Sequence, residues 1–313
     1  MLLLTGPSGA GKSSFARAGL IGHLGAYRLQ RRRAEGALYV GELVRTWRHL
    51  AVRPAELGDY PAGELLARLG AVLGVSDGFA SIVRDLAALP FAGADDIVPV
   101  ALAERFRATV QRPLAGVGPA PALFLLLDQL EDLLGSDRTQ ATRQLLALLR
   151  VLADCPERNI WVVVAIADQW RATLGSAGLA AALEDVPRFA LPPPRESELR
   201  EIIEVPARRA GLVFERRPDG KSLDQEILDD LNRLSLYAEA PLPLLQVALA
   251  QLEDHKDGNR LTLAAYRDMG GVAGAIRSHA RAALAEWQTQ ERQPVLDRLL
   301  FHLVQPDPQQ RIT

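Results

Sequence analysis

A run near the start of the chain matches the phosphate-binding pattern G-x-x-x-x-G-K-[ST]. The run is Gly6-Pro7-Ser8-Gly9-Ala10-Gly11-Lys12-Ser13. Its glycines allow the backbone to wrap around a phosphate and direct successive N–H groups at the oxygens. In this pattern the lysine reaches the β- and γ-phosphates, and the hydroxyl that follows it binds Mg²⁺. The sequence therefore predicts a site for a nucleoside di- or triphosphate.

The flanking residues fit this interpretation. Residues 1–5 are the apolar run expected of a short buried strand, and residues 14–20 have helical spacing, so the positive end of a helix would face the phosphates. A plain glycine-rich turn before a helix is the alternative. The chain has no guanine-reading Asn-Lys-x-Asp element, which favours ATP or ADP as the ligand. The predicted phosphate contacts are Gly6, Ser8, Gly9, Ala10, Gly11, Lys12, Ser13 and Ser14.

A phosphate loop needs an acidic partner at the end of another buried strand, to hold Mg²⁺ through water. Leu125-Leu126-Leu127-Asp128 has this ending, so Ser13 and Asp128 are the predicted metal residues; the alternative for Asp128 is a turn former. Gln129 stands where many hydrolytic ATPases have a carboxylate that orients water. Glu131 and Asp132 lie one helical turn further on and could take that role, and Glu131 is the first candidate. Acids there could equally be favourable charge at a helix start. The predicted catalytic residues are Lys12, Asp128 and Glu131.

Composition excludes several classes of protein. The 313 residues are 48% hydrophobic and carry a net charge of −2, so no overall field draws the chain to nucleic acid or an anionic membrane. Cys155 is the single cysteine, which excludes an internal disulfide framework and favours a cytoplasmic protein. No apolar run approaches the ~20 residues of a membrane span. The abrupt start and end suggest a piece of a longer protein.

Alternating strand and helix patterns predict a doubly wound α/β domain with a parallel sheet over residues 1–190. The expected strands after the first are residues 36–40, 47–52, 122–127 and 160–167, and a helix is expected over 139–152. Trp161 and Trp170 are expected in the core. Beyond the prolines at 192–194 the pattern predicts only helices. We expect a helical lid over residues 191–258 and another region over 259–313.

Five motifs span most of the chain. They are Gly6-Pro7-Ser8-Gly9-Ala10-Gly11-Lys12-Ser13-Ser14 with Arg17-Ala18-Gly19-Leu20, Leu127-Asp128-Gln129-Leu130-Glu131-Asp132-Leu133, Glu204-Val205-Pro206-Ala207-Arg208-Arg209-Ala210-Gly211-Leu212, Pro241-Leu242-Pro243-Leu244-Leu245-Gln246, and Tyr266-Arg267-Asp268-Met269-Gly270-Gly271-Val272-Ala273-Gly274-Ala275-Ile276. In this order they resemble the novel STAND NTPases, signal-transduction ATPases with numerous domains.

The resemblance implies an AAA+-like P-loop NTPase core, a helical lid and the start of a winged-helix region over residues 259–313. It also implies a switch that holds ADP when closed and self-associates after exchange for ATP, with effector and sensor domains outside this chain. Pro243 occupies the position that contacts adenine in the family. Where the family often has an arginine before a small residue and Asp, this chain has Ile166-Ala167-Asp168, and Arg171 is the nearby candidate substitute.

Three functions stay open from the sequence. The first is an ATP-driven signalling switch with slow hydrolysis. The second, suggested by Gln129 and Ile166, is a scaffold that binds nucleotide without hydrolysing it. The third is an AAA+-like ATPase acting on DNA, against which the near-neutral charge argues.

Overall fold

The chain divides into two units, Met1–Pro193 and Pro194–Thr313. A computed structural model describes residues 1–22, 47–89, 98–115, 122–134, 139–155, 159–176, 183, 185–235, 241–285 and 292–303. Each unit is considered by itself. The strand expected over residues 36–40 lies outside the described residues. The division into domains over 1–190, 191–258 and 259–313 stays a prediction.

The first unit contains a five-stranded parallel sheet with the order β2-β3-β4-β1-β5. Its two longest apolar runs form β3 and β4 in the middle of the sheet. Both runs are nearly continuous in apolar residues because a central parallel strand is covered on both faces. The strands are β1 (Leu2–Thr5), β2 (Trp47–Val52), β3 (Ala122–Leu127), β4 (Ile160–Ala165) and β5 (Arg188–Ala190).

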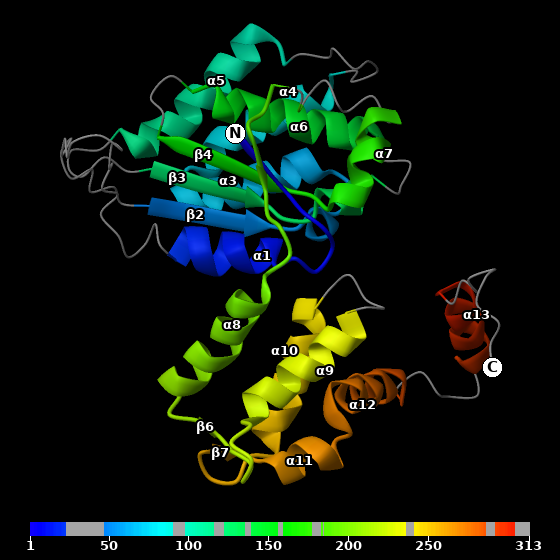
Figure 1. Ribbon diagram of the computed structural model, residues 1–313. Helices are drawn as coiled ribbons and strands as arrows, with labels where there is room; N and C mark the ends of the chain where they lie inside the picture. The colour runs from blue at the N-terminus through cyan, green and yellow to red at the C-terminus, as the bar shows by residue number, and fades with distance from the viewer. Residues whose placement is uncertain are drawn as a thin grey trace, which may run out of the picture. The chain divides into compact units, whose positions relative to one another are not determined.

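Helices cover both faces of this sheet, which confirms the predicted doubly wound α/β class. In Figure 1 the sheet lies between the helix that follows β1 and the helices α4, α5 and α6. The α-helices of this unit are α1 (Lys12–Ser14), α3 (Pro61–Leu73), α4 (Ser76–Ala87), α5 (Val100–Gln111), α6 (Thr139–Ala153) and α7 (Arg171–Ser176). A π-helical segment, η1 (Phe15–Ile21), continues α1. Short 3-10 turns are η2 (Pro54–Leu57), η3 (Arg112–Leu114), η4 (Leu130–Leu133) and η5 (Asp168–Trp170).

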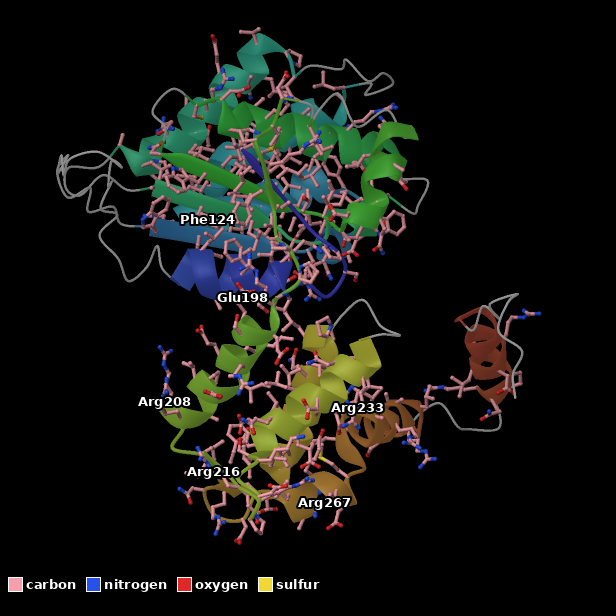
Figure 2. All side chains as sticks on the ribbon, in the orientation of Figure 1. Phe124, Glu198, Arg208, Arg216, Arg233 and Arg267 are labelled. Carbon is pink, nitrogen blue, oxygen red and sulfur yellow. The ribbon has the colours of Figure 1, made fainter. Side chains whose placement is uncertain are left out.

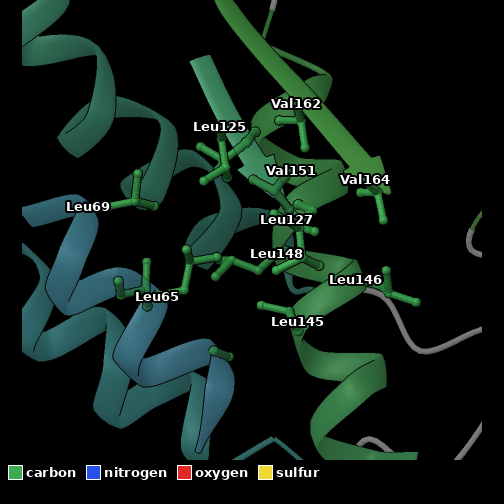
Figure 3. Close-up of a cluster of buried hydrophobic side chains, with 14 of the residues drawn as sticks. Leu65, Leu69, Leu125, Leu127, Leu145, Leu146, Leu148, Val151, Val162 and Val164 are labelled. Carbon is green, nitrogen blue, oxygen red and sulfur yellow. The ribbon is translucent and has the colours of Figure 1, made fainter. Parts of the chain in front are cut away.

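The alternation of side chains along β3 divides its apolar residues between two cores. Leu125 and Leu127 belong to the larger core with Leu65 of α3 and Leu148 of α6 (Figure 3). Phe124 (Figure 2) and Leu126 face the other way, where Ala16 and the partly buried Phe15 of the η1 segment cover them. The phosphate loop therefore lies between a buried strand and a helix that is itself fixed to the sheet.

The sequence missed one strand of this sheet and misplaced one side chain. β5 was not predicted because its three residues are exposed and show no apolar pattern. Trp161, expected in the core, is 42% exposed and packs edge-on against Trp47 with ring centroids 5.2 Å apart. Trp161 lies at the second position of β4 and points away from the buried side chains of Ile160 and Val162. Trp170 is partly buried and packs against the larger core.

The second unit is mainly helical around its own apolar core. Its helices are α8 (Glu196–Arg209), α9 (Leu223–Ser235), α10 (Pro241–Asp254), α11 (Leu263–Asp268), α12 (Gly271–Ala285) and α13 (Gln293–Leu303). The expectation of helices alone is wrong, since β6 (Val213–Phe214) and β7 (Arg260–Leu261) form a two-stranded parallel ladder. Two-residue strands are too short to show a period of two in the sequence.

No helix in the described part of the chain is both long and apolar enough to cross a bilayer.

Candidate nucleotide-binding site

The phosphate loop connects β1 to α1 and depends on glycine at particular positions. Gly9 has φ 74° and Gly11 has φ 88°, values in the left-handed region that other L-residues rarely adopt. Gly11 is also the N-cap of α1, so the helix starts at Lys12. This geometry directs the unpaired N–H groups of the helix start toward the loop, where a phosphate would accept them.

Gly6, the first loop glycine, is required by a close backbone contact. Its φ is 151°, and a Cβ there would lie 2.4 Å from the carbonyl oxygen of Leu191. The Leu191 N–H donates to Thr5 O over 2.8 Å, extending the pairing of β5 with β1. The segment that follows β5 is therefore fixed directly against the start of the phosphate loop.

Lys12 is buried at the base of the loop. Its Nζ donates to Gly6 O and to Pro7 O, each over 2.9 Å, so the ammonium group is held across the start of the loop. Burial lowers the pKa of Lys12, and the nearby carboxylates of Glu131, Asp168 and Asp128 oppose that shift. A cation in this position is suited to phosphate oxygens.

Asp128 follows β3 and meets Ser13, as the sequence predicts. Ser13 Oγ donates to Asp128 Oδ1 over 2.9 Å. The carboxylate is 1% exposed, and the Asp128 N–H donates to Val52 O over 2.9 Å, which fixes the residue at the end of the sheet. Arg17 Nε donates to the other oxygen, Oδ2, over 3.3 Å. Arg17 lies four residues after Ser13 and was not among the predicted site residues.

Glu131 is turned toward the end of β4. Gln129, with φ 66°, is the single non-glycine residue with positive φ in the part of the chain that the structure describes. Gln129, in this left-handed backbone conformation, is the N-cap of η4, and Glu131 is the second residue of η4. Glu131 Oε2 accepts from the Ala167 N–H over 3.3 Å. Burial raises the pKa of Glu131, against the effects of backbone hydrogen bonds and of Lys12.

Asp168, just beyond the end of β4, also lies at the loop and was not among the predicted site residues. The Asp168 N–H donates to Gly6 O over 3.0 Å, beside Lys12, whose pKa the Asp168 carboxylate acts to raise. Ile166 is fully buried, so the position for which the resemblance implies an arginine is part of the core here. Asp168 could have been predicted as a site residue from its position just after a central strand. The carboxyl ends of parallel strands meet at one edge of the sheet, where the phosphate loop also lies. The Arg171 side chain is outside the described residues.

The remaining predicted contacts have varied exposure. Ser8 and Ser14 are exposed and Ala10 is buried within the loop region. Pro243 is exposed in the first turn of α10, in the second unit. Its role toward adenine stays a prediction, as do the predicted roles of the other site residues.

The hydroxyl of Ser13 and the buried carboxylate of Asp128 fit a magnesium site. Both are hard oxygen donors, which Mg²⁺ prefers, and Mg²⁺ in nucleotide sites is held by one or two protein oxygens together with substrate phosphates and water. Among the described residues, no group of three or more His, Cys, Asp or Glu side chains is arranged to hold a metal. Ser13 and Asp128 would therefore hold the ion jointly with the phosphates.

Several solved structures are similar to this chain. The ORC2 protein of Aeropyrum pernix, solved as ADPNP-ADP complexes, is 16% identical with a TM-score of 0.52, covering 89% of this chain and 62% of that chain. The ORC1 protein of Aeropyrum pernix in complex with DNA is 18% identical with a TM-score of 0.48, covering 91% and 61%. A Walker-type ATPase of Pyrococcus abyssi is 12% identical with a TM-score of 0.48, covering 96% and 71%.

The likeness to ORC2 supports a shared fold. The chain spans only about 61% to 62% of the length of these ORC proteins. Among curated proteins, no sequence is similar enough to count as a match. The family model described as Novel STAND NTPase 1 matches residues 1–313. The chain therefore belongs to the novel STAND NTPases, a family of nucleotide-binding P-loop NTPases.

Proposed function

We propose that the chain is the regulatory switch of a multidomain signalling or defence protein, which binds Mg-ATP, hydrolyses it slowly and so controls self-association. The observation that carries the proposal is the meeting of Lys12, Ser13 and Asp128 at one edge of the sheet. The effector and sensor domains of such a protein would lie outside this chain.

The proposed binding mechanism assigns a separate task to each side chain. The loop amides and the Lys12 ammonium group bind phosphate oxygens, while Ser13 and Asp128 hold the metal. Bound Mg²⁺ would supply charge neutralisation at the phosphates. Because Lys12 is fixed by two carbonyl oxygens and Asp128 by a backbone hydrogen bond, these groups need little rearrangement to bind.

The surroundings of Glu131 support slow rather than rapid hydrolysis. Gln129 is an amide and cannot accept a proton from water at this position. Glu131 Oε2 is engaged by the Ala167 N–H, and burial, which raises the pKa of Glu131, favours its protonated form. The bond to Ala167 leaves Oε1 of Glu131 to orient a water molecule, and a carboxyl group that tends to stay protonated is a poor general base. Both features favour slow hydrolysis.

Two backbone contacts support a role as a switch. Gly6 O accepts from the Asp168 N–H, and Thr5 O accepts from the Leu191 N–H, so the start of the loop is joined to the end of β4 and to the segment after β5. A change in phosphate occupancy would act on both segments. Moving a two-state equilibrium from 1:99 to 99:1 takes about 5.5 kcal/mol of differential affinity. Contacts to a γ-phosphate and its metal are the proposed source.

Calorimetry tests nucleotide binding. The chain is titrated with ATP, ADP and GTP, each in Mg²⁺ and in EDTA, and we expect binding of the adenine nucleotides that tightens with the metal. Sedimentation velocity with ADP and with a non-hydrolysable ATP analogue then measures self-association. Rapid hydrolysis by the isolated chain without a trigger would contradict the switch, and absence of metal-dependent binding would contradict the site.

The engagement of Glu131 by Ala167 also favours a second candidate, a scaffold that binds nucleotide permanently without hydrolysis. Single-turnover measurement with γ-labelled ATP separates the two. Slow phosphate release that Asp128→Asn abolishes supports the switch. Binding without any release over hours supports the scaffold.

A further inference from the structure

We propose that Arg17 is a built-in counter-ion for Asp128 that competes with magnesium, and that it thereby sets the metal concentration at which the site binds Mg-nucleotide. Arg17 would act as a positioning residue and not as a catalytic one. The inference rests on the proposed metal role of Ser13 and Asp128.

The two oxygens of Asp128 are held by different partners. Ser13 Oγ donates to Oδ1 over 2.9 Å, and Arg17 Nε donates to Oδ2 over 3.3 Å. The carboxylate is 1% exposed, so water cannot solvate it freely. A buried carboxylate is stable only when hydrogen bonds and a nearby positive charge compensate for the lost hydration. Arg17 supplies that charge by direct contact.

The position of Arg17 allows this contact to be broken. Arg17 follows Ser13 by four residues in the α1–η1 helical segment, so the two side chains lie on the same side and reach the same carboxylate. Unlike Asp128, the Arg17 side chain is 43% exposed. The guanidinium group can therefore move into water, where it remains solvated, while Asp128 stays in place.

Magnesium and Arg17 need the same acceptor. The Asp128 carboxylate would accept hydrogen bonds from the water of a hydrated Mg²⁺ held at Ser13, as it accepts one from the Arg17 guanidinium group now. Two cations at one buried carboxylate also repel each other. Arg17 should thus stabilise the metal-free protein more than the Mg-nucleotide complex, and its removal should make metal binding easier.

Arg17→Ala and Arg17→Gln test the inference, because Gln keeps a hydrogen-bond donor and removes the charge. Arg105→Ala is the matched control, since Arg105 Nη1 pairs with Asp85 Oδ2 over 2.6 Å between two half-exposed side chains of α5 and α4. Thermal unfolding is measured in EDTA and in saturating Mg-ADP. The Mg²⁺ concentration for half-maximal binding of a fluorescent ADP is measured separately, so neither readout requires hydrolysis.

We expect both Arg17 variants to unfold about 2–4 °C lower in EDTA, with a smaller loss in Mg-ADP. The half-saturating Mg²⁺ concentration should fall about 3- to 10-fold. The effect is modest because Arg17 is partly exposed, so water screens its charge. Arg105→Ala should shift unfolding equally in both conditions and leave the Mg²⁺ requirement unchanged. If Arg17→Ala does not fold, Arg17→Gln alone decides the result.

Two results would overturn the inference alone while the wild-type chain still binds Mg-ADP. One is a higher Mg²⁺ requirement in the Arg17 variants, which would make Arg17 a partner of the metal. The other is an equal loss of stability with and without Mg-ADP, which would make it a purely structural residue. A wild-type chain without any metal-dependent binding would instead overturn the proposed function, and this inference with it.

Discussion

Ser13 and Asp128 are 115 positions apart in the sequence, and the Ser13 hydroxyl donates to the Asp128 carboxylate over 2.9 Å. The contact forms because β1 and β3 are parallel strands on either side of β4, so the loop after β1 and the residue after β3 meet at the same edge. In the proposed function, Mg²⁺ binding at this edge would depend on both residues. Variants of each part of the site therefore have distinct expected effects.

Lys12→Ala should weaken ATP and ADP binding by about 10- to 100-fold, because it removes charge-assisted hydrogen bonds to phosphate. Calorimetry of the variant measures the change. Lys256→Ala is the control, because Lys256 lies in the second unit and contacts Glu253 there. Unchanged affinity in Lys12→Ala would mean that the loop does not grip the phosphates.

Asp128→Asn should remove most of the difference between nucleotide affinity in Mg²⁺ and in EDTA. The amide is nearly the same size, so the contact with Ser13 can persist, but it lacks the charge that holds a hydrated divalent cation. Titration of ATP under both conditions gives the difference directly. A metal effect as large as that of the wild type would assign the ion to another residue.

Glu131→Gln should make the chain more stable at neutral pH and leave its stability almost unchanged in acid. Burial raises the pKa of Glu131 above its usual value of 4.5, so the folded chain binds this proton more tightly than the unfolded chain. Stability is then lost as pH rises from the unfolded pKa through the folded pKa. Urea unfolding of the variant and the wild type from pH 4 to pH 7 measures the difference between their free energies of unfolding. A difference that does not widen with pH would refute the prediction.

Gly6→Ala should lower the free energy of unfolding by about 2–4 kcal/mol, because the new Cβ would meet Leu191 O at 2.4 Å and the backbone has φ 151°. Gly22→Ala is the matched control. A Cβ at Gly22 meets nothing within 4 Å, and its φ is helical, so alanine there should be neutral or slightly stabilising. Denaturant titration compares the two, and similar effects would show that the contact with Leu191 is dispensable.

Tyr266→Phe should destabilise the second unit by about 1–2 kcal/mol. The buried Tyr266 hydroxyl donates to Asp230 Oδ2 over 2.7 Å, and the loss of this bond removes a partner from the carboxylate. Tyr60→Phe is the comparison, since the Tyr60 hydroxyl donates to Val83 O over a longer 3.3 Å. Chemical unfolding should show the smaller effect at Tyr60, and the reverse order would be inconsistent with these distances.

The sequence predicted the strands that are marked by a continuous run of apolar residues. The β3 and β4 runs were recognisable because burial on both faces requires continuous apolar residues. β5 and the β6–β7 pair were not, since backbone pairing alone defines such short strands. The prediction that Trp161 lies in the core was wrong. The apolar character of a residue does not show whether a helix packs over that end of the strand.

The sequence predicted the meeting of Ser13 with Asp128, and it missed the other contacts of these residues. Lys12 and Ser13 belong to a pattern of fixed spacing, and Asp128 ends an apolar run typical of a buried strand, so their meeting could be expected. The bond of Arg17 to Asp128 was readable in principle from its helical spacing to Ser13. The left-handed conformation of Gln129 and the bond between Glu131 and Ala167 depend on tertiary structure and leave no mark in the sequence.

The contact between Gly6 and Leu191 has a mechanical consequence. Leu191 is followed by Pro192, Pro193 and Pro194, and consecutive prolines have fixed φ and form a stiff, extended spacer. Because the spacer is stiff, a pull on it would move Leu191 rather than stretch the chain. The Leu191 N–H is hydrogen-bonded to Thr5 O, next to the first loop glycine. A displacement of Leu191 would therefore be felt directly at Thr5 and at Gly6, the first loop glycine.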